Sequence, residues 1–243
     1  MFPATLTGVG VGPGDPRQVT LAALDALRAA ARVVAPSSSA EAVGRAESVV
    51  RQVCPEVAAT RLVIPMGRSP RSVYRDGARR IAGWLDIGEA VAFVTLGDPN
   101  VYSTFTSLAA AVREVRPETP IRTVPGIMAF QVLAASASTT VLDGTQSMTL
   151  TTGLDDLDRL DDALENPAET LVVYKGGRRF PEIAKRAASA GRLEGAVAGE
   201  LLGMPGERVV PLADVAGTPS AYLSTIIIPA VSVEPTESGE GPG

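Results

Sequence analysis

Three glycine-containing stretches each follow a short apolar run, and these stretches are the parts of the chain best suited to hold a ligand. They are Gly8–Asp15, Gly97–Pro99 and Val124–Gly126. Glycine lets the backbone turn sharply and approach a bound molecule closely. In open α/β sheets, ligands bind beyond the carboxyl ends of the strands. We therefore expect a ligand site lined by these loops; the simpler alternative is that the glycines only permit tight turns.

The first stretch fits the dinucleotide-binding fingerprint poorly. Pro13 or Asp15 stands where the third glycine belongs, depending on the register. The first acidic residue after the second predicted strand is Glu41, which a loop separates from the strand end. A nicotinamide cofactor, and with it a dehydrogenase, is therefore disfavoured.

The absence of histidine removes much of the usual catalytic chemistry. Ser-His-Asp triads, Cys-His pairs and histidine-based zinc sites are excluded. A single cysteine, Cys54, allows neither an intrachain disulfide nor a cysteine-based zinc site, and we expect no metal. An enzyme with this sequence must use carboxylates, hydroxyls, arginine, backbone groups or a cofactor with its own reactivity.

Two further features have both a functional and an ordinary structural interpretation. Arg71, Arg75 and Arg79 recur at a spacing of four and share one face of a predicted helix. They suit a ligand with several carboxylates, but such a face is often only solvated. Asp98 could accept hydrogen bonds from a ligand or cap the helix that follows.

Composition defines the broad class of protein. The chain has 243 residues, of which 45% are hydrophobic and 20% charged, so it is not intrinsically disordered. A pI of about 4.9 and 4% aromatic residues disfavour nucleic-acid binding. We find no signal peptide and no apolar run long enough to span a membrane. The expectation is a soluble, cytoplasmic protein.

The order of apolar runs predicts two α/β domains. In residues 1–122, five apolar runs alternate with helical patterns, which indicates a mostly parallel sheet with helices on both faces. In residues 123–233 the strands are more closely spaced, which indicates a mixed sheet. We expect strand Arg32–Ala35 to end at Pro36, a helix over Tyr102–Val115, an acidic linker Asp155–Glu165 and a disordered tail over 234–243.

Taken in order, several stretches resemble the tetrapyrrole methyltransferases that depend on S-adenosylmethionine. They cover residues 6–230 and are listed here: Gly8–Asp15 with Thr20-Leu21, Leu96–Pro99, Val124–Ile127, Leu171–Gly176 and Gly203–Arg208. Within the family, Asp98–Phe105 is similar to the branch that methylates C20 of precorrin-2 or cobalt-precorrin-2 in cobalamin biosynthesis. The resemblance implies two α/β domains with the cofactor in the cleft between them, a polycarboxylate tetrapyrrole as substrate, and a homodimer.

The resemblance also implies site residues. For the cofactor and its product S-adenosyl-L-homocysteine these are Pro13, Gly97, Asp98, Pro99, Tyr102, Ser103, Thr104, Met128, Ala129, Lys175 and Ala198. For the substrate we expect Gly12 and Asp15 together with Arg71, Arg75 and Arg79 of the arginine face. Met128 stands where the family usually has a small or hydroxyl residue, and Lys175 where it often has methionine. No general base is assigned.

Other functions remain as alternatives. One is the same fold acting on another substrate: uroporphyrinogen III, a later precorrin, or a protein in a diphthamide-type methylation. The arginine face favours a polycarboxylate over a protein. Another is a ligand-binding module without catalysis, which an assay of methyl transfer would distinguish.

Overall fold

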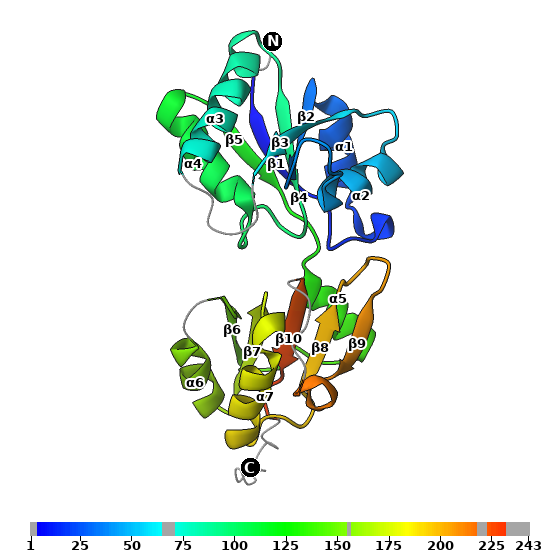
Figure 1. The fold of residues 1–243 in the computed structure, drawn as a ribbon, viewed down its shortest axis with the longest axis vertical. Coiled ribbons are helices and arrows are strands. Elements are labelled where there is room, and N and C mark those ends of the chain that lie inside the picture. The colour runs from blue at the N-terminus through cyan, green and yellow to red at the C-terminus, as the bar shows by residue number, and fades with distance from the viewer. Residues whose placement is uncertain (1–3, 65–70, 155–156, 218–222, 232–243) are drawn as a thin grey trace, which may run out of the picture. The chain divides into compact units, whose positions relative to one another are not determined.

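Strands and helices alternate through the first half of the chain and build a parallel sheet (Figure 1). The computed structural model describes residues 4–64, 71–154, 157–217 and 223–231, so the tail expected over 234–243 lies outside the described residues. The chain divides into two compact units, Met1–Ala129 and Phe130–Gly243. Each unit has its own five-stranded sheet.

The first unit carries its strands in the order β3-β2-β4-β1-β5, and every neighbouring pair is parallel. Its elements are β1 (Leu6–Gly10), the short 3-10 helix η1 (Pro16–Gln18), α1 (Leu21–Ala29), β2 (Arg32–Ser37), α2 (Arg45–Val53), β3 (Ala59–Val63), α3 (Arg71–Asp86), β4 (Val91–Thr95), α4 (Thr104–Val115) and β5 (Ile121–Val124).

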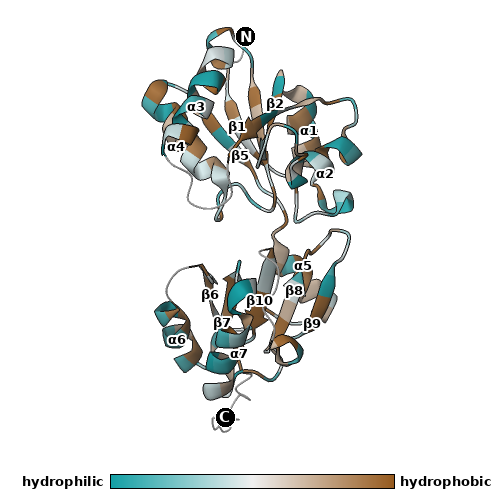
Figure 2. Ribbon diagram, viewed as in Figure 1, coloured by the Kyte–Doolittle hydropathy of each residue, from teal (hydrophilic) through white to brown (hydrophobic). Residues whose placement is uncertain are grey.

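Two hydrophobic clusters hold this sheet between helices. On one face, residues such as Leu27 of α1 and Val49 of α2 pack against Val94 of β4. On the other face, Ile81 of α3 and Leu108 of α4 pack against apolar side chains of the sheet. In Figure 2 the hydrophobic colour concentrates on the strands and the hydrophilic colour on helices and connections. The prediction of a parallel sheet covered on both faces is confirmed.

Strand β2 does not end at Pro36, contrary to expectation. It continues to Ser37, and Pro36 is paired in register with Leu62 of β3. The pairing of β2 with β4 covers only Arg32–Val34. Beyond that point the strand has a neighbour on one side only, so the N–H that proline lacks is not needed there.

The second unit contains a mixed sheet in the order β6-β7-β10-β8-β9. β6 and β7 are parallel, and the other three pairs are antiparallel. Its elements are α5 (Ala129–Ala137), which begins at the unit boundary, β6 (Ser147–Thr152), α6 (Asp158–Glu165), β7 (Glu169–Tyr174), the 3-10 helix η2 (Gly177–Arg179), α7 (Phe180–Ser189), β8 (Val197–Glu200), β9 (Arg208–Pro211), the 3-10 helix η3 (Leu212–Val215) and β10 (Ser224–Ile228). The mixed sheet expected here is confirmed.

Within the stretch 155–165, expected to be an acidic linker, residues 158–165 form the helix α6 instead, and residues 155–156 lie outside the described residues. Leu157, Leu160 and Leu164 recur at helical spacing and are all buried in the core of the second unit. Asp158 and Asp161 lie in the first turn, where a helix N-terminus favours negative charge. The charge that suggests a linker is therefore the solvent face of an amphipathic helix.

Candidate cofactor site

The carboxyl ends of β1, β4 and β5 lie side by side, because these strands are parallel neighbours in the first sheet. Their loops meet directly. The Gly97 N–H donates to the carbonyl of Gly12 at 2.8 Å, and the Val11 N–H donates to the carbonyl of Thr95 at 2.9 Å. The structure thus brings the three glycine stretches together at one sheet edge, as the sequence predicts.

Gly10, Gly97 and Gly126 form a close contact of three backbones, called here the glycine junction. A Cβ atom at Gly10 would lie 2.4 Å from the Gly97 carbonyl oxygen, and one at Gly126 would lie 2.2 Å from the same oxygen. Gly97 itself has a φ of +65°, and a Cβ there would meet no described atom within 4 Å. The junction is therefore closed toward the sheet and open on the side of Gly97.

Asp98 connects two of the loops and does not cap a helix. Its Oδ1 accepts from the Asn100 N–H at 2.8 Å, and its Oδ2 accepts from the Gly126 N–H at 3.2 Å. The Asn100 side chain donates to the Thr123 hydroxyl at 3.2 Å. The sequence analysis names the stretch that contains Gly126 but not its contact with Asp98, and it does not single out Asn100 or Thr123, because these contacts join residues 23 to 28 positions apart.

Helix α4 begins at Thr104, two residues later than predicted, and Ser103 is its N-cap. The Ser103 hydroxyl accepts from the Phe105 N–H at 3.1 Å and donates to the Thr95 hydroxyl at 3.0 Å. Tyr102 has a φ of +46°, which is incompatible with the helix and uncommon for an aromatic residue. Its side chain is about half exposed, at 49%. Pro99 is buried, and its carbonyl accepts from the Thr106 hydroxyl at 3.4 Å.

The first loop is held by its own side chains. Pro13 is buried, and Gly12 has a φ of +74°. The Asp15 carboxylate accepts from the backbone and side chain of Arg17, and these hydrogen bonds lower its pKa. Asp15 is also the N-cap of η1. Arg17 thus already provides the counter-charge for Asp15, which the sequence analysis assigns to the substrate.

Met128 and Ala129 are partly buried at the end of the first unit, where α5 begins. The other predicted residues belong to the second unit. Lys175 follows β7 with a φ of +58°, its N–H donates to the Ser224 carbonyl at 2.9 Å, and burial lowers the pKa of its ammonium group. Ala198 of β8 is fully buried within the core cluster.

Tyr174, beside Lys175, was not predicted as a site residue. Its hydroxyl accepts from the Phe130 N–H at the start of α5, at 3.3 Å. Burial raises the pKa of this phenol to about 12, so it stays protonated at neutral pH.

The three arginines lie on the exposed surface of α3. Arg75 pairs with Glu114 of α4 at 3.7 Å, and Arg79 pairs with Asp76 at 3.3 Å. Arg71 is the first residue of the helix. Since α3 leads from the carboxyl end of β3 back to the start of β4, Arg71 belongs to the helix end nearer the edge that carries the glycine junction.

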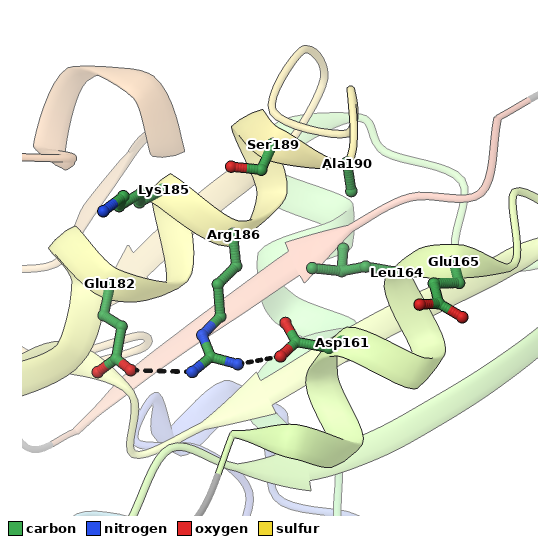
Figure 3. A pocket seen from close by; sticks show the side chains of 8 residues that line it. All are labelled: Asp161, Leu164, Glu165, Glu182, Lys185, Arg186, Ser189 and Ala190. Atoms are coloured by element: carbon green, nitrogen blue, oxygen red, sulfur yellow. Dashed lines mark hydrogen bonds and ion pairs between the residues drawn. The ribbon is translucent and has the colours of Figure 1, made fainter.

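A separate groove of about 600 Å³ lies between α6 and α7 in the second unit (Figure 3). Arg186 reaches across it from α7 to Asp161 of α6 and also pairs with Glu182 at 3.2 Å. None of the predicted site residues lines this groove.

The described part of the chain shows neither a cluster of metal-ligating side chains nor a helix that could span a membrane. Across residues 4–64, 71–154, 157–217 and 223–231, no three His, Cys, Asp or Glu side chains come together in a way that could hold a metal ion. Among the helices of these same ranges, none is long and apolar enough to cross a membrane.

Comparison with known proteins decides the family. The sequence profile of the Tetrapyrrole (Corrin/Porphyrin) Methylases matches residues 5–216. The chain belongs to this family. Tetrapyrrole methylases of this family take the methyl group from S-adenosyl-L-methionine.

Individual relatives agree with the family assignment. The chain is 31% identical over 239 residues to the cobalamin biosynthesis protein CobIJ of Mycobacterium tuberculosis, covering 93% of this chain and 46% of CobIJ. It thus spans about half the length of these first relatives. It is 28% identical over 236 residues to the precorrin-2 C(20)-methyltransferase of Sinorhizobium sp, covering 92% of this chain and 94% of the relative.

A solved structure confirms the fold. The cobalt precorrin-4 methyltransferase CbiF superposes with a TM-score of 0.72 at 20% identity, covering 93% of this chain and 94% of that one. At this identity the likeness concerns the fold, which is the pair of α/β sheets that the sequence predicts.

The glycine junction fits the methyl donor of the family. The absence of a Cβ at Gly97 leaves open space above the loop, where a ligand can approach the backbone. The loops after three parallel strands converge there, which is where open α/β sheets bind their ligands. A cofactor that brings its own reactive group also suits a chain without histidine.

Proposed function

We propose that the chain transfers a methyl group from S-adenosylmethionine to C20 of precorrin-2 or cobalt-precorrin-2 in cobalamin biosynthesis. The similarity to the Sinorhizobium enzyme carries this proposal, because it extends over nearly all of both chains. The run Tyr102–Phe105 directly after the Asp98 loop supports the same branch of the family.

We propose that the cofactor site includes the loops at the glycine junction. In the first unit its residues are Pro13, the backbone of Gly97, Asp98 and Pro99, and also Tyr102, Ser103, Thr104, Met128 and Ala129. The resemblance to the family also implies Lys175 and Ala198, which belong to the second unit. The shape of the junction supports close backbone contact at Gly97, where a side chain would occupy the ligand's space.

Transfer of a methyl group to C20 would release S-adenosylhomocysteine and the proton of C20, and no residue is assigned as the base that accepts this proton. When bound, the cofactor supplies an electrophilic methyl group, and a reduced tetrapyrrole has electron-rich meso carbons. The protein's contribution is to align the two and exclude water; such orientation can lower a barrier by about 7–11 kcal/mol. Tyr174, with its pKa of about 12, is a hydrogen-bonding group at neutral pH and not a base.

For the substrate we propose Gly12, Asp15 and the α3 arginines. Guanidinium groups form charge-assisted pairs with carboxylates, and a tetrapyrrole carries several acetate and propionate groups. Arg71 is the best placed, because it begins α3 at the end nearer the glycine junction. We further propose that the enzyme works as a homodimer in the cytoplasm.

The second candidate is the same reaction at another position of the ring. The 31% identity to CobIJ, whose name gives cobalamin biosynthesis but no ring position, leaves room for this alternative. Both candidates need the same cofactor and a polycarboxylate ring, so only the product distinguishes them.

The deciding experiment supplies purified protein with S-adenosylmethionine and either precorrin-2 or cobalt-precorrin-2. We expect a product heavier by one methyl group, with a changed ultraviolet–visible spectrum and with C20 as the labelled carbon when the methyl donor carries ¹³C. Methylation of a later precorrin but not of these two would favour the alternative. Absence of transfer to any tetrapyrrole would contradict both.

A further inference from the structure

We propose that Asp98 is a positioning residue that sets the spacing of the cofactor loops through protein contacts, and not a residue that itself binds the cofactor. Its contacts with Asn100 and Gly126, and the contact of Asn100 with Thr123, are called here the Asp98 latch. This inference rests on the proposed cofactor site at the glycine junction.

The carboxylate of Asp98 is already engaged by the protein. One oxygen accepts from Asn100, and the other accepts from Gly126 in the neighbouring loop. The Asn100 side chain also donates a hydrogen bond to Thr123 of β5, the strand that leads into that loop. One oxygen of Asp98 thus connects the loop after β4 to the loop after β5, and the other orders the loop after β4 itself.

The latch acts at the place where the backbones are closest. Gly126 is the residue whose Cβ would lie 2.2 Å from the Gly97 carbonyl oxygen. The Asp98 carboxylate therefore holds Gly126 next to Gly97, the position with open space toward a ligand. A small shift of Gly126 would move the open side of the junction, because the three backbones touch.

The latch also explains why an aspartate is suitable at this position. Pro99 disfavours a helical conformation at Asp98 and leaves the preceding loop stiff. A carboxylate offers two acceptor oxygens, one for each of the two N–H groups. Asparagine offers only one oxygen, so it can preserve at most one of the two contacts.

The test measures affinity for two ligands in four variants. The ligands are S-adenosylhomocysteine and 5′-methylthioadenosine, which lacks the amino-acid part. The variants are Asp98→Ala, Asp98→Asn, Thr123→Val and, as a matched control, Thr60→Val on the opposite edge strand β3. Calorimetry gives the affinities, and melting temperatures are recorded on the same samples.

We expect Asp98→Ala to weaken the binding of both ligands by the same factor, about ten- to a hundredfold, because the charged carboxylate loses its hydrogen bonds to two donors. Asp98→Asn should lie between Asp98→Ala and the native protein. Thr123→Val, which removes one exposed neutral hydrogen bond and keeps the fold, should weaken both by about two- to tenfold. Thr60→Val should change neither.

Two results would overturn the inference. If Asp98→Ala weakened S-adenosylhomocysteine but not 5′-methylthioadenosine, Asp98 would contact the amino-acid part directly. If Thr123→Val left the affinities unchanged, as Thr60→Val should, the Asn100–Thr123 hydrogen bond would not position the loops. If Asp98→Ala failed to fold, Thr123→Val alone would decide in the same way.

Hydrogen exchange separates failure of the latch from failure of the proposed site. In the native protein, S-adenosylhomocysteine should slow exchange in residues 96–103 and 125–128. Protection there together with unchanged affinities in the variants overturns the latch alone. Binding without protection of these loops overturns the site, and the latch with it.

Discussion

Arg75 of α3 lies 3.7 Å from Glu114 of α4, and both side chains are about half exposed. An exposed pair of this kind contributes at most about 1 kcal/mol. Arg75 therefore already has a carboxylate partner, whereas Arg71 stands at the first turn of the helix. If the arginine face binds the substrate, Arg71 and Arg75 should therefore contribute differently to the affinity for the tetrapyrrole.

We predict that Arg71→Ala raises the KM for the tetrapyrrole by about ten- to a hundredfold, the value of one charge-assisted contact. Arg79 lies about 12 Å farther along the helix, so Arg79→Ala should have a much smaller effect. Arg75→Ala should fall between them, because Glu114 shares the charge of Arg75. Steady-state kinetics with varied tetrapyrrole measure all three.

A suitable control is Arg113→Ala, an exposed arginine in the last turn of α4. It should leave the KM unchanged, and all four variants should bind S-adenosylhomocysteine like the native protein. Equal KM values for Arg71→Ala and Arg113→Ala would mean that the arginine face is only solvated.

A second prediction concerns the N-cap of α4. Ser103→Ala should lower the free energy of unfolding by about 1–2 kcal/mol, because the Phe105 N–H loses its acceptor. Ser103→Thr should retain most of the stability. Urea unfolding measures the difference, with Ser107→Ala on the exposed part of the same helix as the control. Equal stability of Ser103→Ala and Ser107→Ala would contradict the capping role.

Local patterns predicted most of the fold because they report the burial of each segment. The first sheet follows from apolar runs such as 91–95, all of whose residues are buried. Helix α6 was missed because its acidic residues obscured the spacing of Leu157, Leu160 and Leu164. The helical spacing of these three leucines is by itself enough to predict the helix.

The site was predicted only in part, because spacing along the chain does not specify contacts across the sheet. The glycine stretches pointed to the right loops. The contact of Asp98 with Gly126 spans 28 residues, and no pattern around either residue signals it. Likewise, the sequence predicts Asp98 as a candidate cap and Ser103 inside the helix, and only the backbone path through Tyr102 makes Ser103 the cap.

A third prediction concerns pH and the buried carboxylate of Glu47. Hydrogen bonds from Arg61, and then from Arg51, hold its pKa below the ordinary value of 4.5. A carboxyl group with a lowered folded pKa stabilises the protein above its unfolded pKa, and this contribution is lost as the pH falls through the folded pKa. Glu47→Gln should therefore cost about 1–3 kcal/mol at pH 7.

The difference between native protein and Glu47→Gln should shrink as the pH falls below about 4.5, because the carboxyl group of the unfolded chain binds a proton there before that of the native protein does. Urea unfolding at several pH values measures it. Glu118→Gln, at an exposed position, should differ from the native protein by a small and constant amount. A Glu47→Gln difference that stayed constant down to pH 3 would contradict the ion-pair explanation.

The last prediction compares two glycines that have the same kind of backbone but lie in different places. Gly97 and Gly88 have φ values of +65° and +84°, and a Cβ at either would meet no described atom within 4 Å. Alanine at either position should therefore cost a similar amount of stability, about 1–2 kcal/mol, from left-handed backbone strain alone. Only Gly97 belongs to the glycine junction, so only Gly97→Ala should place a methyl group in the space proposed for the cofactor. Its affinity for S-adenosylhomocysteine should fall by about ten- to a hundredfold, while Gly88→Ala binds normally. Thermal unfolding and calorimetry on both variants measure the two effects separately, and equal affinities would place the cofactor away from Gly97.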